Sequence, residues 1–173
     1  MDSERLGMLI DRLAAPLELY ARQWCDEFED VVQEAFVKLA TQPTTPTNPA
    51  AWLFRTVRNG AINAGIAKRR RLRHEAEAVA RVPSWFETGP AARNRAIVDP
   101  ESAQAALAVL PLEQREIIVA HLWGGLTFDQ IAELVGFSAG STHRLYQAGL
   151  TALREHLGVP CQANPSRPRP NRS

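Results

Sequence analysis

Apolar residues recur every three or four positions along most of this chain, and this spacing restricts its fold more than any other feature. It matches the period of an α-helix with one buried side. No stretch alternates apolar and polar residues as a half-buried strand would, and no internal repeat occurs. Before residue 41 the apolar positions form two series, Leu6, Leu9, Leu13, Leu17 and Tyr20, then Phe28, Val32, Ala35, Phe36 and Leu39. The spacing predicts an all-α protein.

A third helix is predicted to begin at Asn48 and Pro49, after the loop sequence TQPTTPT. Asparagine is a favoured N-cap residue, and proline suits the first helical position because the N–H there has no partner inside the helix. The apolar positions of this helix are Trp52, Leu53, Val57, Ile62 and Ile66. The three helices predict a small bundle within residues 1–77.

Residues 78–100 separate this bundle from a second helical part. They contain several prolines and no sustained period, which predicts a flexible linker. Trp85 and Phe86 lie within it, and we expect them to pack back on one domain, with the docking of a partner as the alternative. Helices are predicted again over 101–157. The proline- and arginine-rich residues 158–173 are predicted to form a disordered tail.

The second part contains the pattern of a helix-turn-helix. Thr127 and Gln130 have the spacing of a capping box at the start of a short helix. Gly136 then permits the positive φ of a tight turn, and a longer helix begins at about Ala139. Its inner side is expected to carry Leu145, Ala148 and Leu153. A short helix, a tight turn with glycine and a second helix predict two small helical domains, of which the C-terminal one is a helix-turn-helix.

If this motif binds DNA, its second helix enters the major groove. The side chains expected to project outward are Ser141, His143, Arg144 and Gln147. Arginine and glutamine can pair with guanine and adenine edges through two hydrogen bonds, while serine discriminates less. For His143, contact with a phosphate and contact with a base are equally compatible with the sequence.

No catalytic or metal-binding motif is present. The two cysteines, Cys25 and Cys161, are far apart and lack the spacing of a zinc site, so they are expected to be reduced thiols. The four histidines are scattered along the chain, and His121 lies in an apolar stretch where a hydrogen-bonded packing role is expected. Neither HExxH nor a glycine-rich phosphate loop occurs. We therefore predict no cofactor and no enzyme activity.

The N-terminus begins with acidic residues, unlike a signal peptide, and no apolar run approaches the roughly 18 residues of a membrane span. These features predict a cytoplasmic protein without membrane insertion.

Charge is unevenly distributed although the net charge of the chain is +1. Residues 26–34 hold five acidic residues and no basic residue, namely Asp26, Glu27, Glu29, Asp30 and Glu34. Residues 55–73 hold seven basic residues and no acidic residue, namely Arg55, Arg58, Lys68, Arg69, Arg70, Arg71 and Arg73. The densest part, AKRRRLR at 67–73, is compatible with a solvated helix face, a localisation tag or an anion-binding stripe. The bundle is expected to present one negative and one positive face.

Three segments resemble the extracytoplasmic-function sigma factors, the small two-domain sigma subunits of bacterial RNA polymerase. They are FEDVVQEAFVKLA at 28–40, AWLFRTVRNGAINAGIAKRRR at 51–71, and the region from LPLEQRE through the helix-turn-helix at 110–154. These blocks resemble the polymerase-binding helix, the promoter helix with its trailing arginines, and the C-terminal domain of that family. Residues 101–157 would then read the minus-thirty-five element.

The resemblance assigns roles to particular residues. It places polymerase binding on Glu29, Asp30, Gln33 and Glu34. It places contact with the minus-ten element on Arg55, Arg58, Asn59, Asn63, Lys68, Arg69, Arg70 and Arg71. It places contact with the minus-thirty-five element on Thr127, Ser141, His143, Arg144 and Gln147. AKRRRLR thus becomes a phosphate-binding extension of the promoter helix. Trp52 lies on the apolar series, so core packing is favoured over base stacking.

Two departures from the family pattern limit what can be carried over. Asn63 stands where the family usually has aspartate, and His143, Arg144 and Leu145 stand where it often has Lys-Ser-Arg. The promoter preference of relatives therefore does not transfer to this recognition helix.

The resemblance implies core RNA polymerase and promoter DNA as partners of a chain expected to be monomeric when free. An anti-sigma factor is a further candidate partner, because sigma factors of this type are commonly held inactive by one. The alternative is another helix-turn-helix protein, either a transcription regulator or a DNA-packaging subunit. These would need a receiver domain or an oligomerisation segment, and neither pattern is visible in the sequence.

Overall fold

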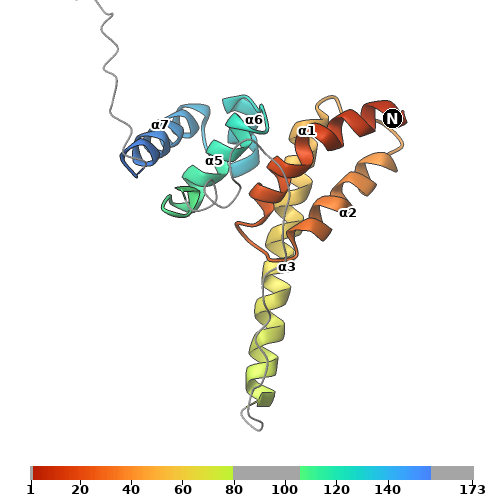
Figure 1. Ribbon diagram of the computed structural model, residues 1–173, viewed down its shortest axis with the longest axis vertical. Coiled ribbons are helices and arrows are strands. Elements are labelled where there is room, and N and C mark those ends of the chain that lie inside the picture. Colours follow the sequence, from red (N-terminus) through yellow and green to blue (C-terminus); the bar gives the residue numbers. More distant parts are fainter. Residues whose placement is uncertain (1, 80–105, 157–173) are drawn as a thin grey trace, which may run out of the picture.

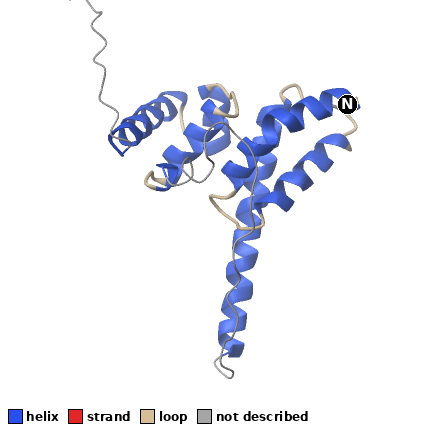
Figure 2. Cartoon of the chain, in the orientation of Figure 1, coloured by secondary structure: helices blue, strands red, loops and turns tan. Residues whose placement is uncertain are grey.

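The computed structural model describes residues 2–79 and 106–156, and every regular element in these two ranges is an α-helix. Figure 2 shows these helices and the short loops between them. The all-α prediction is confirmed. Trp85, Phe86 and the predicted tail at 158–173 lie outside the described residues.

The N-terminal part consists of α1 (Ser3–Ala21), α2 (Phe28–Ala40) and α3 (Pro49–Val79), which pack against one another. The Oδ1 atom of Asn48 accepts a hydrogen bond from the backbone N–H of Ala51 at 3.1 Å, which confirms the predicted start of α3. Trp52 is partly buried against the core, as expected. α3 extends past residue 77 into the range predicted as a linker, and its second half projects beyond the bundle (Figure 1).

The C-terminal part consists of α5 (Leu112–Leu122), α6 (Phe128–Val135) and α7 (Ala139–His156). Thr127 and Gln130 form the predicted capping box, and Gly136 ends α6 with a φ of 82°. His121 packs as expected, with Nδ1 2.8 Å from the carbonyl oxygen of Leu126 and its ring stacked on Phe128. The helix-turn-helix prediction is confirmed.

The buried side of α7 agrees with the prediction at Leu145 and Leu153, which pack against the core, and differs at Ala148, which is exposed. The most buried positions are Thr142, Tyr146 and Gly149. A Cβ atom on Gly149 would lie 2.7 Å from Cδ1 of Ile118, so glycine allows α7 to approach α5 closely. A search for apolar residues does not detect threonine or glycine, so the apolar pattern missed Thr142 and Gly149 on this side.

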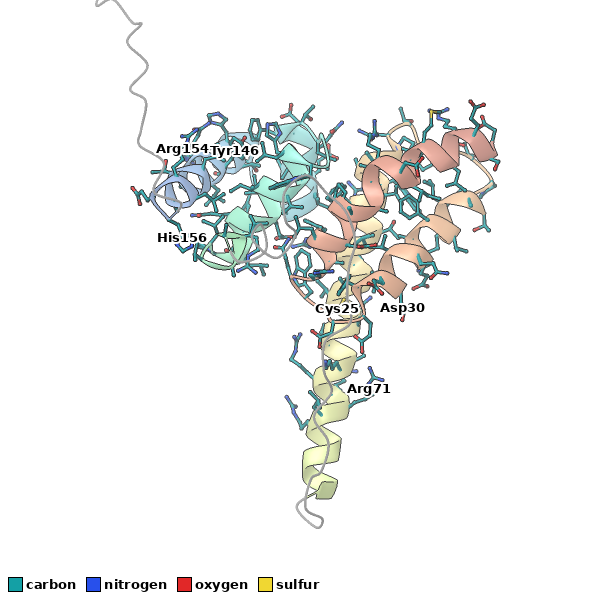
Figure 3. The ribbon with its side chains drawn as sticks, in the orientation of Figure 1. Cys25, Asp30, Arg71, Tyr146, Arg154 and His156 are labelled. Atoms are coloured by element: carbon teal, nitrogen blue, oxygen red, sulfur yellow. The ribbon has the colours of Figure 1, made fainter. Side chains whose placement is uncertain are left out.

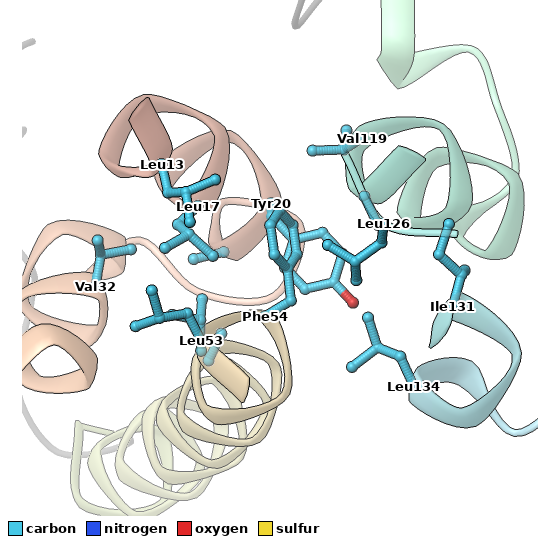
Figure 4. Packing of buried hydrophobic residues seen from close by; sticks show 14 of the residues in the cluster. Leu13, Leu17, Tyr20, Val32, Leu53, Phe54, Val119, Leu126, Ile131 and Leu134 are labelled. Atoms are coloured by element: carbon cyan, nitrogen blue, oxygen red, sulfur yellow. The ribbon is translucent and has the colours of Figure 1, made fainter. Parts of the chain in front are cut away.

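One hydrophobic core runs through both parts of the chain. Tyr20 and Phe54 of the N-terminal part face Val119, Leu126 and Leu134 of the C-terminal part (Figure 4). All five side chains are buried. The two helical units, which the sequence predicts as separate domains, therefore pack against each other.

The packing at Gly65 gives a test of how tightly α3 is held. A Cβ atom there would lie 2.4 Å from the carbonyl oxygen of Trp24, whereas one on Gly7 would meet nothing within 4 Å. Gly65→Ala should lower the free energy of unfolding by about 1–3 kcal/mol because the backbone must move. Gly7→Ala should raise it by about 0.5–1 kcal/mol through helix propensity. Urea unfolding followed by circular dichroism measures both, and equal stability of the two variants would contradict this packing.

Candidate functional site

The outward side of α2 carries the residues predicted to bind polymerase. Val32, Ala35, Phe36 and Leu39 are buried on the inner side of this helix. On the opposite side the side chains of Glu29, Asp30, Gln33 and Glu34 are accessible. Val37 lies in the next turn and is 54% exposed, so the surface also includes an apolar side chain that charge alone did not predict. The four predicted residues therefore share one accessible helix face.

The acidic field extends from α2 onto α1 through Glu18. Burial raises the pKa of this carboxyl group, the nearby carboxylate of Glu29 raises it further, and Arg22 partly offsets both. Burial is the main cause of this shift, and the contribution of Glu29 shows that the two carboxylates lie close enough to repel each other.

The projecting part of α3 carries the densest positive charge. Arg69, Arg70, Arg71 and Arg73 are all exposed there. In Figure 3, Arg71 lies on this projecting part, while Asp30 lies on α2 within the bundle. The predicted anion-binding stripe is therefore accessible along a helix that stands clear of the bundle.

Two acidic residues neutralise part of this stripe. Lys68 pairs with Asp26, and Arg71 Nη2 lies 3.6 Å from Glu27 Oε1. The hydrogen bond to Asp26 raises the pKa of Lys68. Asp26 and Glu27 were expected to belong to the acidic face, and this expectation is wrong. The loop between α1 and α2 turns them toward α3, so the charge run in the sequence divides between two surfaces.

The first turns of α3 hold the other residues predicted to contact the minus-ten element. Asn59 and Asn63 are exposed. Arg58 and Arg55 instead face the C-terminal part, where Arg58 Nε donates to Glu116 Oε1 at 2.7 Å and Arg55 Nη2 lies 3.5 Å from Glu133 Oε2. The eight predicted residues thus lie along one helix in three groups. Two arginines pair with carboxylates of the C-terminal part, two asparagines are exposed and uncharged, and four basic residues lie at the projecting end.

Glu116 also accepts a hydrogen bond from the Tyr20 hydroxyl at 3.0 Å. Burial, followed by the nearby Glu116 carboxylate, raises the pKa of Tyr20 well above its usual value. The hydrogen bond to Glu116 raises the pKa of Arg58. Sequence reasoning missed Glu116 and Tyr20. The sequence did hold one indication that Glu116 is buried, because this residue directly precedes the apolar run IIVA of α5.

The residues of α7 that are predicted to contact the minus-thirty-five element lie together near the start of this helix. His143, Arg144 and Gln147 are exposed and Ser141 is half-buried. Ser141 Oγ accepts a hydrogen bond from Arg144 Nη2 at 3.0 Å, which restrains the guanidinium group. Thr127 lies at the N-terminus of α6, where its hydroxyl accepts from the N–H of Gln130.

Two further side chains support this surface. Ser138 Oγ accepts a hydrogen bond from the N–H of Ser141 at 3.2 Å at the start of α7. The His143 and Phe128 rings form a T-shaped pair, with ring centroids 5.0 Å apart. The first contact caps the start of α7, and the second holds the exposed side of α7 against α6.

Comparison with known proteins identifies both halves of the chain. A family model described as sigma-70 region 2 matches residues 9–74, and one described as sigma-70, region 4 matches residues 101–153. Together these models cover more than half of the chain and follow the order of the two helical units.

Two solved structures share the fold. One is described as the sigma factor RpoE in complex with the anti-sigma factor NepR from Bartonella quintana, with a TM-score of 0.60 and 23% identity over 91% of this chain and 99% of that chain. The other is described as CnrH in complex with the cytosolic domain of CnrY, with a TM-score of 0.55 and 21% identity over 91% of this chain and 90% of that chain.

This chain belongs to the sigma-70 family, with the region 2 and region 4 organisation of the extracytoplasmic-function sigma factors. These are non-enzymatic initiation factors that bind core RNA polymerase and direct it to promoter DNA. Within residues 2–79 and 106–156, no helix is long and apolar enough to cross a membrane. The same part of the chain holds no group of three or more His, Cys, Asp or Glu side chains suited to a metal ion.

Proposed function

We propose that α2 binds core RNA polymerase, that α3 contacts the minus-ten element, and that α7 reads the minus-thirty-five element. The observation that carries this assignment is the placement of two opposite charges in the region 2 unit. The acidic side of α2 and the basic end of α3 are both exposed and belong to different helices. One surface suits a basic protein and the other suits phosphate.

The α2 surface has the composition of a protein interface. Exposed carboxylates around Val37 combine long-range attraction with an apolar contact. Such charges mainly increase association rate and select the partner, while buried apolar area adds affinity. A basic surface of polymerase is therefore the expected partner of this helix.

The α3 surface would exchange its present partners for DNA. Lys68 and Arg71 now face carboxylates, and phosphates could take the place of those groups. Arg69 and Arg70 make no salt bridge among the described residues and would meet phosphates directly. Asn59 and Asn63 present amide groups able to contact base edges.

On the C-terminal unit, Arg144 and Gln147 are three positions apart on α7 and project to one side. Arginine and glutamine supply the donors and acceptors that distinguish bases in the major groove. Ser141, His143 and Thr127 would contact the neighbouring backbone or bases. Polymerase would perform the chemistry of transcription.

We also propose that the protein works in the cytoplasm and is controlled by an anti-sigma factor. Support for the second point is the fold shared with RpoE and CnrH, whose structures are described as complexes with NepR and CnrY.

Run-off transcription with purified core polymerase on genomic fragments tests the function as a whole. Specific transcripts that require this chain are expected. DNA binding without any transcript would favour a helix-turn-helix regulator that acts independently of core polymerase.

Charge reversal tests the polymerase surface. Asp30→Lys combined with Glu34→Lys should weaken binding to core polymerase at low salt, because both side chains lie on the exposed side of α2. Helicity should be retained, since neither residue is part of the core. Glu4→Lys with Asp11→Lys on α1 makes the same change in net charge elsewhere. Equal binding by the two double variants in a titration of labelled core enzyme would refute the assignment of α2.

Salt dependence tests the basic end of α3. Arg69→Ala with Arg70→Ala should reduce holoenzyme affinity by a similar factor on all promoter variants, because phosphates carry no sequence information. The slope of log affinity against log salt should fall by about 0.9 for each phosphate that the variant no longer neutralises. Arg5→Ala with Arg12→Ala on α1 is the matched control. An unchanged slope in the α3 variant would assign these arginines to a solvated helix face.

A promoter library randomised over the upstream element tests α7. Arg144→Ala or Gln147→Ala should each cost about 1–3 kcal/mol on the preferred sequence, the scale of one bidentate base contact. This penalty should largely vanish on promoters already changed at the contacted base. Arg154→Ala, near the end of the same helix, should weaken binding independently of sequence. If the first two variants keep every parental base preference, these residues do not read the promoter.

A further inference from the structure

A series of hydrogen bonds runs along the exposed start of α7. Ser138, Ser141 and Arg144 follow one another at intervals of three positions, so their side chains lie on one side of the helix. The Ser138 hydroxyl donates to Ser141 Oγ at 2.9 Å, and Arg144 Nη2 donates to the same oxygen at 3.0 Å. Ser138 is not among the residues predicted to contact the minus-thirty-five element, whereas the other two are.

Ser138 is held in place from the buried side of α7. Its carbonyl oxygen accepts hydrogen bonds from the backbone N–H of Thr142 at 2.9 Å and from the Thr142 hydroxyl at 3.0 Å. Thr142 is fully buried. The series of hydrogen bonds therefore starts at a residue that the core anchors, and it ends at the exposed guanidinium group of Arg144.

These contacts use both acceptor positions of the Ser141 hydroxyl. A serine hydroxyl has one hydrogen to donate and two lone pairs that accept. One lone pair of Ser141 Oγ accepts from Ser138 and the other from Arg144. The O–H group remains, and it can only donate. Ser141 is therefore available to DNA as a hydrogen-bond donor.

Arg144 is also a donor, because a guanidinium group has no acceptor atom. Its hydrogen bond to Ser141 uses an N–H group of Nη2 and leaves the other N–H groups for a base edge. A side chain that is restrained before binding loses less conformational entropy on binding. Neighbouring donors complement the N7 and O6 acceptors of guanine, whereas the amino group of cytosine or adenine would find no acceptor here.

We propose that Ser138 is a positioning residue for promoter recognition, which acts through Ser141 to hold Arg144 and to present only donors to guanine in the minus-thirty-five element. The inference deepens the proposed function and rests on the role assigned to α7. Ser138 makes no base contact of its own in this account. It also caps α7, because its Oγ accepts from the N–H of Ser141. A test must therefore separate positioning from capping.

Binding of holoenzyme to a promoter library randomised over the upstream element tests the positioning role. Ser138→Gly removes both side-chain contacts at little cost to the helix, since glycine is accepted at N-cap positions. At the base where Arg144→Ala relaxes the preference, Ser138→Gly should lower the preference for guanine about three- to tenfold, the scale of one net hydrogen bond. Ser138→Thr keeps a hydroxyl and should retain the parental preference.

Asn48→Gly is the matched control. Asn48 caps α3 through a side-chain hydrogen bond to the N–H of Ala51, as Ser138 caps α7, but it lies in the other helical unit. This variant should leave the preferences over the upstream element unchanged. An unaltered guanine preference in Ser138→Gly, or a wild-type preference for cytosine or adenine at the contacted base, would overturn the proposal.

Ser141→Ala separates positioning from capping. It removes the hydroxyl that connects Ser138 to Arg144 but keeps the backbone N–H that Ser138 caps. Adding Ser138→Gly to Ser141→Ala should change the guanine preference by less than about twofold, because the two residues act as one unit. A cap that acts only on the helix would cause the same loss in both backgrounds, and that result would refute positioning.

The same library distinguishes failure of this inference from failure of the proposed function. If Arg144→Ala and Gln147→Ala both keep every parental preference, α7 does not read the promoter and the proposed function fails. If Arg144→Ala relaxes the preference and Ser138→Gly does not, the role of α7 stands and the positioning role of Ser138 is refuted.

Discussion

The arrangement of the two helical units depends on one buried carboxylate. Glu116 is removed from water, and an ionised group in such a place is tolerated when partners compensate its charge. Those partners, Arg58 and Tyr20, belong to α3 and α1. Their hydrogen bonds restrain α5 against the N-terminal bundle, beside the shared apolar core in which Phe54 closely approaches Gly124.

This packing leaves the proposed working surfaces unequally accessible. The outer side of α2, the projecting end of α3 and the reading side of α7 remain exposed. The first turns of α3 are covered where Arg58 meets α5.

Much of the fold was predictable because helix period and capping depend on residues close in sequence. Contacts between residues far apart in sequence were not predictable. The apolar period predicted the helices, and Asn48, Thr127 and Gly136 marked their ends correctly because capping depends on neighbouring residues. On the buried side of α7 the sequence predicted Leu145 and Leu153 but missed Gly149, which packs through its small size. Glu116 and Arg58 are 58 positions apart, and no local pattern connects them. The candidate site was predictable as a set of exposed residues, while the occupation of Arg58 by Glu116 required the tertiary structure.

The distance between the two units tests their packing against each other most directly. Nitroxide labels at Met8 on α1 and Glu113 on α5 occupy exposed positions outside the proposed binding surfaces, in a chain with Cys25 and Cys161 replaced. Pulsed electron paramagnetic resonance of the free chain should give one narrow distance distribution. Addition of core polymerase should replace it with a distribution at greater distance, up to the reach of the connecting residues, about 90 Å. A broad distribution in the free chain, or one unchanged by polymerase, would contradict the account.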